Sequence, residues 1–555
     1  MSDLICIRIE NTSSTMEVEM GTPLSEIALK LPTPPSAYLA AMVNNRIKEL
    51  SYRIYKPSTI RLIDGYTFEG SRVIQRTAIF LLQTAVEELL PGHTLYVRHS
   101  LGDGFYCVID GIEPIGAELC EQLKAAISRL IEAEIPIERK RLTTDEVRAR
   151  YAERGYTDKI ELLDTRPRLY SNLQTMGSSI GYFYGPLAPS SGAVTCFDLK
   201  PYGSGMQLIL PHRSSPNELR EQMPREKMAD VFSEYQNWVR MMGIPTVGAI
   251  NRTIQKGLAG AMIKVADAFH ERKFTQIADA IVRANLENGT RTVLISGPSS
   301  SGKTTSSKRL SVQLGVLGLK PVMISLDDYF VDRDKTPLDE NGEYDYEALE
   351  AIDLKLFNEH LKRLMEGEQV EIPRYDFITG RRQWHEAPLQ LDDRSILIIE
   401  GIHGLNPRLT PAIPRHQKFL IYISCFTSVA MDNLSRIATT DNRLLRRLIR
   451  DNRTRGHNAL ATLSRWPSVR RGEEKHIFPY QENADAMLNS SLFYEIAVLR
   501  PYAEQILREV PDTVPEYNEA QRLLQLLDNF TPMPDDEIAP TSILREFIGG
   551  STFKY

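Results

Sequence analysis

The chain has 555 residues, which is too long for a single hydrophobic core, and ordinary domain sizes predict three or four units. Its formal net charge is −6 with both signs interspersed, so the overall charge gives no reason to expect nucleic-acid binding. The five cysteines have no C-x-x-C spacing, which excludes an obvious zinc site or disulfide framework and favours reduced, buried thiols.

Residues 1–69 alternate apolar and polar side chains in the manner of strands. Residues 4–9 and 16–20 predict a hairpin, and a short helix over 24–31 and strands near 41–46 and 59–63 follow. This ββαββ order resembles the TGS domain, a β-grasp module at the front of threonyl-tRNA synthetases and some regulatory GTPases. No signal segment precedes the hairpin and no apolar run could cross a bilayer, so we expect a cytoplasmic protein without membrane contact.

Residues 70–215 start with a helical pattern that ends at Pro91, and a turn and strand follow over 102–110. Together with Tyr184-Gly185-Pro186, this order resembles the second additional domain of threonyl-tRNA synthetases, an α+β domain that edits mischarged tRNA with four metal ligands. At the corresponding positions this chain has Arg76, Phe80, Phe183 and Leu187. None of these side chains is a plausible metal ligand, so the editing chemistry is not carried over. Two hypotheses stay open: a former editing domain kept for binding, or a packing partner that positions the rest of the chain.

Residues 216–288 predict helices that lead to the most informative stretch of the chain. An apolar strand over 292–296 and a helix over 305–314 flank a segment that fits the phosphate-binding template G-x-x-x-x-G-K-S/T. The segment consists of Gly297, Pro298, Ser299, Ser300, Ser301, Gly302, Lys303 and Thr304. Backbone N–H groups at such a helix N-terminus converge on phosphate oxygens. We expect Lys303 to reach the β- and γ-phosphates of ATP, Thr304 to hold Mg²⁺, and Thr305 and Arg455 to complete the nucleotide site.

Two further predicted strands end in acidic residues. The strand over 322–326 leads into Asp327, and the nearly unbroken apolar strand over 395–399 leads into Glu400. In open parallel sheets, ligands bind at this edge. Asp327 is therefore predicted to accept the proton of an attacking hydroxyl beside the metal, and Glu400 to hold the water shell of Mg²⁺. The alternative for each acid is a strand-end cap or a salt bridge.

Two cationic segments complete the predicted site. Residues 372–377, followed by Arg381 and Arg382, form an aromatic and cationic cluster suited to stacking a ring and pairing with an anion; the alternative is a solvated hairpin. A helical pattern then places Arg443, Arg446, Arg447 and Arg450 along one side. We interpret it as a lid that closes over the triphosphate, against the alternative of an exposed charged helix.

These motifs, in this order over residues 292–507, are similar to those of the uridine/cytidine kinase branch of the uridine kinase and phosphoribulokinase family. The resemblance implies that Asp327 is the base for a nucleoside 5′-hydroxyl, that Asp345 holds the ribose and that Tyr375 faces the base. It also implies that the arginines clamp phosphates and substrate, Arg446 and Arg450 during transfer and Arg382 and Arg447 on the substrate. Two departures weaken base specificity: Gly380 stands where uridine kinases carry a histidine that reads the pyrimidine, and the aromatic pair after Asp327 is altered to Asp328-Tyr329-Phe330.

The sequence thus predicts an α/β protein in five parts. A P-loop parallel-sheet kinase domain occupies 289–510, preceded by the TGS-like β-grasp domain at 1–69, the α+β second-additional-domain-like unit at 70–215 and a helical connector at 216–288, and followed by a tail at 511–555. The expected activity is ATP- and Mg²⁺-dependent phosphorylation of a small metabolite, foremost the 5′-hydroxyl of a pyrimidine nucleoside. Another small alcohol as acceptor, or an RNA- or ribosome-associated ATP-binding regulator, remains open. The tail is expected to dock on its own subunit or on a neighbour in a homo-oligomer.

Overall fold

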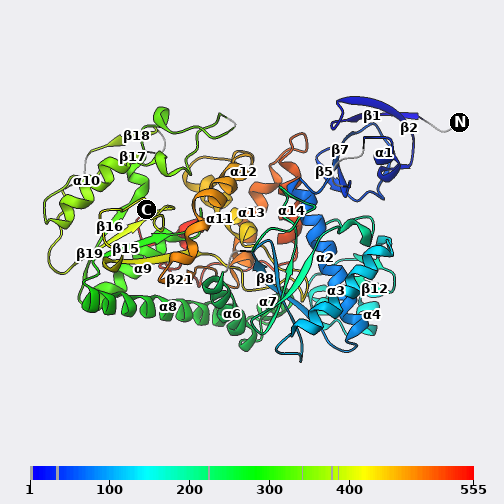
Figure 1. Ribbon diagram of the computed structural model, residues 1–555, viewed down its shortest axis with the longest axis horizontal. Coiled ribbons are helices and arrows are strands. Elements are labelled where there is room, and N and C mark those ends of the chain that lie inside the picture. The colour runs from blue at the N-terminus through cyan, green and yellow to red at the C-terminus, as the bar shows by residue number, and fades with distance from the viewer. Residues whose placement is uncertain are drawn as a thin grey trace.

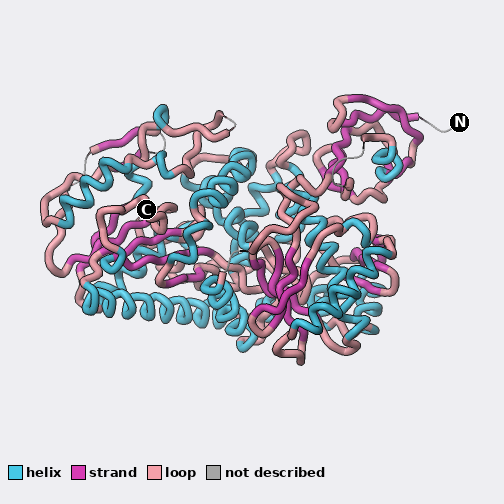
Figure 2. Tube along the Cα trace, in the orientation of Figure 1, coloured by secondary structure: helices cyan, strands magenta, loops and turns pink. Residues whose placement is uncertain are grey.

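The computed structural model describes residues 4–32, 37–222, 225–340, 342–376, 379–384 and 387–554. A small β-sheet unit lies at one end of the molecule and a parallel sheet at the other (Figure 1). Helices lie between the parallel sheet and the antiparallel sheet of the second unit (Figure 2). The α/β fold class predicted from the sequence is confirmed.

The N-terminal unit is a five-stranded sheet of order β2-β1-β7-β4-β5. Its strands are β1 (Leu4–Ile9), β2 (Ser14–Glu19), β4 (Ala40–Val43), β5 (Arg46–Lys48) and β7 (Thr59–Ile63), with the short pair β3 (Thr22–Pro23) and β6 (Arg53–Ile54) and the helix α1 (Leu24–Leu29) beside them. The predicted β1–β2 hairpin is confirmed, because Ile5, Ile7 and Ile9 point to the core while the residues between them are exposed.

The second unit packs helices against two antiparallel sheets. One sheet, of order β13-β14-β9-β8, contains β8 (Leu95–Leu101), β9 (Gly104–Ile109), β13 (Asp198–Tyr202) and β14 (Gly205–Ile209). The other contains β10 (Ile137–Thr143), β11 (Tyr170–Met176) and β12 (Ser179–Gly181). The helices are α2 (Phe68–Leu89), α3 (Ala117–Glu132), α4 (Thr144–Glu153) and α5 (Thr157–Asp164). Residues 203–204 form the turn between β13 and β14.

Three helices connect this unit to the parallel sheet: α6 (Glu226–Met241), α7 (Val247–Gln255) and α8 (Ala259–Asn288). The sheet has the order β16-β19-β15-β20-β21 and every neighbouring pair is parallel. Its strands are β15 (Thr292–Ser296), β16 (Lys320–Ser325), β19 (Ser395–Glu400), β20 (Lys418–Ser424) and β21 (Ala486–Asn489). The central strand β15 therefore precedes the phosphate-binding loop, with β19 on one side and β20 on the other.

The remaining elements surround this sheet. They are α9 (Lys303–Val316), α10 (Leu354–Met365), the hairpin β17 (Arg374–Asp376) and β18 (Arg381–Gln383), α11 (Thr439–Thr454), α12 (Ala459–His476) and α13 (Glu495–Arg508). The C-terminal segment forms α14 (Tyr517–Leu527) and α15 (Arg545–Ile548). Leu523 and Leu544 are fully buried in a hydrophobic cluster shared with α5, α7, α11 and α13, so the tail packs on its own chain. Within the described ranges, no helix is both long and apolar enough to cross a membrane.

Candidate active site

The phosphate-binding loop connects β15 to α9 at the carboxyl edge of the parallel sheet. Gly302 has φ +80° and Ser300 φ +59°, so the chain turns sharply through the left-handed region before α9 begins. A Cβ at Gly297 would lie 2.0 Å from the carbonyl oxygen of Ile423 on β20. Glycine is therefore required at both template positions, at Gly297 by close packing and at Gly302 by backbone conformation.

Thr304 and Glu400, predicted from separate motifs, meet at this edge. Thr304 donates a hydrogen bond to Glu400 Oε1 at 3.2 Å, and Ser325, the last residue of β16, donates to the same oxygen at 3.3 Å. Lys303 Nζ donates to the carbonyl oxygen of Pro298 at 3.2 Å. Hydroxyl and carboxylate oxygens around one point are the ligands that Mg²⁺ prefers, so these side chains fit the metal that the loop implies.

Four carboxyl groups lie close together beside the loop. Burial and the neighbouring carboxylate of Asp327 raise the pKa of Glu400. Burial and the nearby carboxylate of Glu473 raise the pKa of Glu347 to about 7, with Asp327 adding to the effect and Lys303 opposing it. One oxygen of Glu347 is buried without a hydrogen-bond partner in the described chain. Such a concentration of buried carboxyl groups is typical of a site that receives a cation.

Asp327 begins the short turn that follows β16, within the 3-10 helix Leu326–Tyr329. Among the described residues its side chain forms neither a hydrogen bond nor an ion pair, and the residue is only partly buried. The negative charge of Asp327 acts to raise the pKa values of Glu400, Glu347 and Arg455. An unpaired carboxylate in this position is available to an incoming hydroxyl.

The arginines of α11 differ from the expected lid in how they are placed. Arg443 and Arg446 are buried, at 1% and 0% exposure, where the prediction had them facing the triphosphate. Arg446 Nε donates to Glu495 at 2.9 Å, and its terminal nitrogen donates to the carbonyl oxygen of Ser490 at 2.8 Å. Buried guanidinium groups need such partners, and α13 and the β21 edge supply them. The catalytic role assigned to Arg446 stays a prediction.

Three other arginines of this segment gather around one carboxylate. Asp451 contacts Arg447 at 3.2 Å, Arg450 at 2.8 Å and Arg455 at 3.5 Å, and these charges lower its pKa below the ordinary range despite its burial. Arg447 also donates to the hydroxyl of Ser299 in the loop at 2.9 Å. The neighbouring charge of Arg450, followed by burial, lowers the pKa of Arg455 to about 10. Three arginines thus surround one acid beside the loop, an arrangement suited to binding phosphate.

Two carboxylates already accept hydrogen bonds from the loop. Glu473, on α12, accepts the backbone N–H of Ser299 at 3.1 Å and forms a buried ion pair with Arg443. Glu546, on α15, accepts the backbone N–H of Thr305 at 3.2 Å and its hydroxyl at 2.5 Å. These N–H groups thus face anionic acceptors, as expected of a phosphate cradle.

The C-terminal segment is fixed against the loop by α11. Arg453 donates to the carbonyl oxygens of Phe547 at 3.0 Å and of Glu546 at 2.9 Å. Ile543 Cγ2 lies 2.9 Å from where a Cβ of Gly302 would be. The tail therefore forms one wall of the loop.

The residues predicted to hold the substrate are all engaged by the protein. Asp345 accepts the backbone N–H of Glu347 at 3.1 Å, and its interaction with His476 holds its pKa below the ordinary range. Tyr375 is 7% exposed and packs edge-on against Phe330 at 5.6 Å. Arg382 forms an ion pair at 3.0 Å with Asp353, the residue that caps α10. Their binding roles stay predictions, and Phe377, from the same motif, lies outside the described residues.

Gly380 has a structural reason to be glycine. It has φ +70°, its N–H donates to the carbonyl oxygen of Asp376, and a Cβ would lie 2.8 Å from Arg333 Nε. A histidine here would be strained and would displace Arg333. In the altered aromatic pair, Tyr329 is buried and its hydroxyl lies 3.1 Å from Nδ1 of His360, so it points into the core.

The four positions of the absent editing ligands lie in the second unit. Phe80 and Phe183 pack together with ring centres 5.5 Å apart, and Leu187 is 3% exposed. Arg76 donates to the carbonyl oxygen of Pro186 at 2.9 Å and lines a cavity at the junction of the units. Three of the four positions are therefore part of a hydrophobic core.

Comparison with known proteins separates the two halves of the chain. Residues 292–496 match the model of the Phosphoribulokinase / Uridine kinase family. This segment is a P-loop domain of that family. The N-terminal region is similar to the N-terminal domains of threonine–tRNA ligases: the enzyme of Symbiobacterium thermophilum is 30% identical over 201 residues, which are 36% of this chain and 31% of the relative. The chain thus spans about a third of that relative's length.

Two solved structures are also similar to part of this chain. A "Possible Uridine Kinase" from Bacillus stearothermophilus is 20% identical, with 39% of this chain and 97% of that chain covered and a TM-score of 0.27. D-glycerate 3-kinase from Cryptococcus neoformans is 14% identical, with 48% of this chain and 89% of that chain covered and a TM-score of 0.22.

Three site carboxylates escaped the sequence analysis: Glu347, Glu473 and Glu546. None of them belongs to the phosphate-binding template or follows an apolar strand. Glu473 lies in a helix with several charged residues, and Glu546 lies more than 240 positions after the loop residue that it contacts. Only the paucity of acids around the arginines of α11 could have indicated that buried acids would come from elsewhere in the chain.

Proposed function

We propose that the chain transfers the γ-phosphoryl group of ATP to a hydroxyl of a small metabolite, with the 5′-hydroxyl of uridine or cytidine as the first candidate acceptor. One observation carries the proposal: the hydrogen-bonded pair Thr304 and Glu400 and the unpaired Asp327 lie at the same edge of the sheet as the phosphate-binding loop. The match of residues 292–496 to the Phosphoribulokinase / Uridine kinase family supports it.

The roles follow from charge and hydrogen-bonding capacity. Lys303 and the N–H groups of Ser299 and Thr305 bind phosphate oxygens. These two N–H groups already donate to negatively charged oxygens, those of Glu473 and Glu546. Mg²⁺, held by Thr304 and Glu400 beside Asp327, supplies positive charge to the β- and γ-phosphates when bound. Asp327 accepts the proton of the acceptor hydroxyl. Arg447, Arg450 and Arg455 stabilise the charge of the transferring group.

A second candidate is a kinase for a small alcohol other than a pyrimidine nucleoside. Gly380 leaves the β17–β18 turn without a side chain to read a base, and Arg333 occupies the adjacent space. Arg382, a predicted substrate contact, forms an ion pair with Asp353. A site without its hydrogen-bonding reader discriminates poorly between acceptors, which favours a different or broader substrate.

Release of ADP from ATP and Mg²⁺, measured against a panel of nucleosides, sugars, hydroxy acids and hydroxy-amino acids, tests both candidates. We expect one acceptor class to stimulate ADP release. Asp327→Asn should keep ATP affinity within about twofold and lower the acceptor-dependent rate by about 10²- to 10⁴-fold, the usual contribution of a general base.

Asp334→Asn is the matched control, because Asp334 is exposed in the same connection after β16. This variant should retain the wild-type rate. Acceptor-dependent turnover that is equal in Asp327→Asn and the wild type would contradict the proposed base, and ADP release stimulated by RNA or ribosomes alone would contradict a metabolite kinase.

A further inference from the structure

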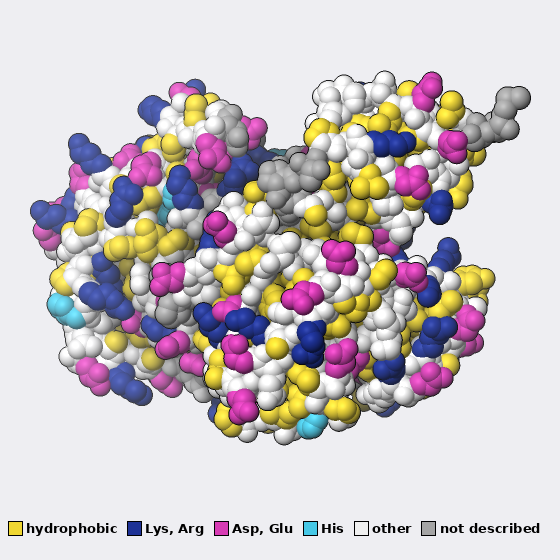
Figure 3. Space-filling view, turned by 45° about the vertical axis from the view of Figure 1, so that its right-hand side comes forward, with side chains coloured by type: hydrophobic (Ala, Val, Ile, Leu, Met, Phe, Trp, Pro, Cys, Tyr) yellow, Lys and Arg dark blue, Asp and Glu magenta, His cyan; other side chains and the backbone are white. Residues whose placement is uncertain are grey.

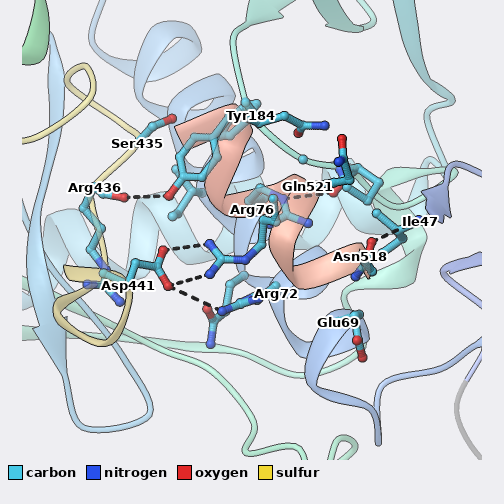
Figure 4. A pocket seen from close by; sticks show the side chains of 18 of the residues that line it. Ile47, Glu69, Arg72, Arg76, Tyr184, Ser435, Arg436, Asp441, Asn518 and Gln521 are labelled. Atoms are coloured by element: carbon cyan, nitrogen blue, oxygen red, sulfur yellow. Dashed lines mark hydrogen bonds and ion pairs between the residues drawn. The ribbon is translucent and has the colours of Figure 1, made fainter. Parts of the chain in front are cut away.

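A cavity of about 240 Å³ lies where the N-terminal sheet, the second unit and the P-loop half meet (Figure 4). Its walls come from β5, from α2, from the segment around Tyr184, from the residues before and at the start of α11, and from α14. The cavity is separate from the phosphate-binding loop, since none of the loop residues lines it. Its volume exceeds the space that a few water molecules need.

Positive charge dominates the lining. Six cationic side chains contribute to it: Arg46, Lys48, Arg72, Arg76, Arg436 and Arg522. The acidic side chains in the lining are Glu69 and Asp441. Asp441 is already used, since it accepts two hydrogen bonds of 2.7 Å from Arg522 and lies 3.7 Å from Arg72.

Arg76 and Arg436 have no acidic partner. In the described parts of the chain neither forms an ion pair, and the one side-chain hydrogen bond of Arg76 goes from Nε to the carbonyl oxygen of Pro186. The guanidinium of Arg436 lies 5.2 Å from the ring centre of Phe105. Burial and the neighbouring Arg72 lower the pKa of Arg76 to about 9, and burial also lowers that of Arg436. The carboxylates of Glu49 and Asp441 partly oppose these shifts without forming an ion pair with either arginine. Two desolvated guanidinium groups without an ion-pair partner are costly unless an anion joins them.

The rest of the lining suits an organic body attached to that anion. Phe105, Phe183 and Tyr184 present ring surfaces, and Gln75, Asn518 and Gln521 present amide groups that both donate and accept hydrogen bonds. Guanidinium groups bind phosphate through two parallel hydrogen bonds, which a carboxylate of similar size also accepts. Phosphate carries the larger charge near neutral pH and thus better offsets two unpaired arginines.

We propose that this cavity is a binding site for a small metabolite that carries a phosphate group, whose negative charge is attracted by the cationic lining, foremost by Arg76 and Arg436. Positive and negative side chains are interspersed on the face of the molecule seen in Figure 3. This face lacks the continuous basic stripe that binding of a polyanion such as RNA would need. The site is independent of the phosphotransfer proposed above. Because Asp441 lies in the first turn of α11, the bound metabolite would contact the helix whose arginines hold the phosphate-binding loop.

Calorimetric titration of the full chain with inorganic phosphate and with pyrophosphate tests the site. The parent protein for the titration carries Lys303→Ala, which weakens phosphate binding at the loop. We expect saturable binding of at least one of the two probes, at least tenfold weaker after Arg76→Gln or Arg436→Gln. Arg8→Gln, which removes an exposed cation from β1, is the control and should change affinity less than twofold.

Thermal unfolding distinguishes a binding role from a structural one. Without phosphate, Arg76→Gln should unfold at the same or a higher temperature than its parent, because an uncompensated buried charge is removed while a donor to Pro186 is kept. Added phosphate should raise the unfolding temperature of the parent and leave that of Arg76→Gln unchanged. If Arg76→Gln does not fold, Arg436→Gln from a different segment answers the same question.

Several results would overturn the proposal. The first two are that neither phosphate probe binds and that both arginine variants keep the parent's affinity. Titrations with malonate, a dicarboxylate, and with transfer RNA supply the other two: binding of malonate without binding of either phosphate, and binding of transfer RNA alone. An Arg76→Gln protein that is less stable than its parent and yet binds phosphate equally would assign Arg76 to packing.

Discussion

Arginines gather at two places in this molecule, and they are partnered differently. Around the phosphate-binding loop, Arg443 pairs with Glu473, Arg446 with Glu495, and the cluster of Arg447, Arg450 and Arg455 with Asp451. At the junction cavity, Arg76 and Arg436 have no such carboxylate in the described chain.

This difference in pairing distinguishes arginines that stabilise the fold from arginines that are available to a ligand. A buried cation with a carboxylate partner stabilises the fold only as part of the pair, so removing one partner destabilises. A buried cation without a partner destabilises the empty protein and stabilises the liganded one. Of the four predictions below, three test a paired arginine or the loop that such arginines support, and one tests a buried histidine. They contrast with the expected behaviour of Arg76→Gln.

The largest effect is expected at the buried pair of Arg446 and Glu495. Arg446→Ala leaves Glu495 buried without its partner, which costs about 3–5 kcal/mol of stability. The midpoint of urea unfolding should fall accordingly, and the double variant Arg446→Met with Glu495→Leu should recover most of the loss. A double variant that is stable and fully active would show that Arg446 supports the fold without acting on phosphate, contrary to its predicted catalytic role.

Lys303→Ala should lower acceptor-dependent ADP release by about 10²- to 10³-fold, because a charged donor to the transferring phosphate is lost. The unfolding temperature should change little, since the one hydrogen bond of this side chain in the described chain is to the carbonyl oxygen of Pro298. Lys256→Ala, at an exposed position after α7, is the control and should keep full activity. Equal activity in the two variants would contradict a role of Lys303 in phosphoryl transfer.

Buried His270 should make the protein acid-labile. Burial lowers its pKa from 6.5 to about 3, so the unfolded chain binds a proton below pH 6.5 that the folded chain refuses, and stability falls as the pH falls. Between pH 7 and pH 5 this group costs about 2 kcal/mol at 1.36 kcal/mol per pH unit. His270→Gln should flatten the fall in unfolding temperature over this range, whereas the exposed control His416→Gln should not. If the unfolding temperature falls equally with pH in both variants, the acid lability does not come from His270.

The smallest effect is expected for Glu546→Gln. The amide still accepts the hydrogen bond from Thr305, but the negative charge at the loop is gone, which should tighten ATP binding by about threefold to tenfold, or about 1 kcal/mol. Glu537→Gln, which removes an exposed carboxylate paired with Lys264, is the matched control from the same tail. Weaker ATP binding in Glu546→Gln would mean that the carboxylate positions Thr305 for the nucleotide.

Much of the fold could be predicted because the signals were local. The β1–β2 hairpin follows from strict alternation, and β15 and β19 follow from short apolar runs that end at a loop or an acid. Thr304 and Glu400 were each predicted, from separate motifs, to serve Mg²⁺, and the carboxyl ends of parallel strands share one edge. The placement of α11 could not be predicted, since spacing shows which arginines share a helix side but not whether that side faces solvent or the core.

The sequence by itself determined the phosphate-binding loop, the strands that flank it and the acids at their ends, since each depends on a few adjacent residues and on their backbone preferences. Tertiary structure alone decided which carboxylates neutralise the arginines, that Glu546 reaches Thr305, and that Arg76 and Arg436 face one cavity. These contacts join segments up to several hundred positions apart. The physical reason is that a charge is satisfied by whatever packing brings within a few ångströms, and no short pattern along the chain encodes that neighbour.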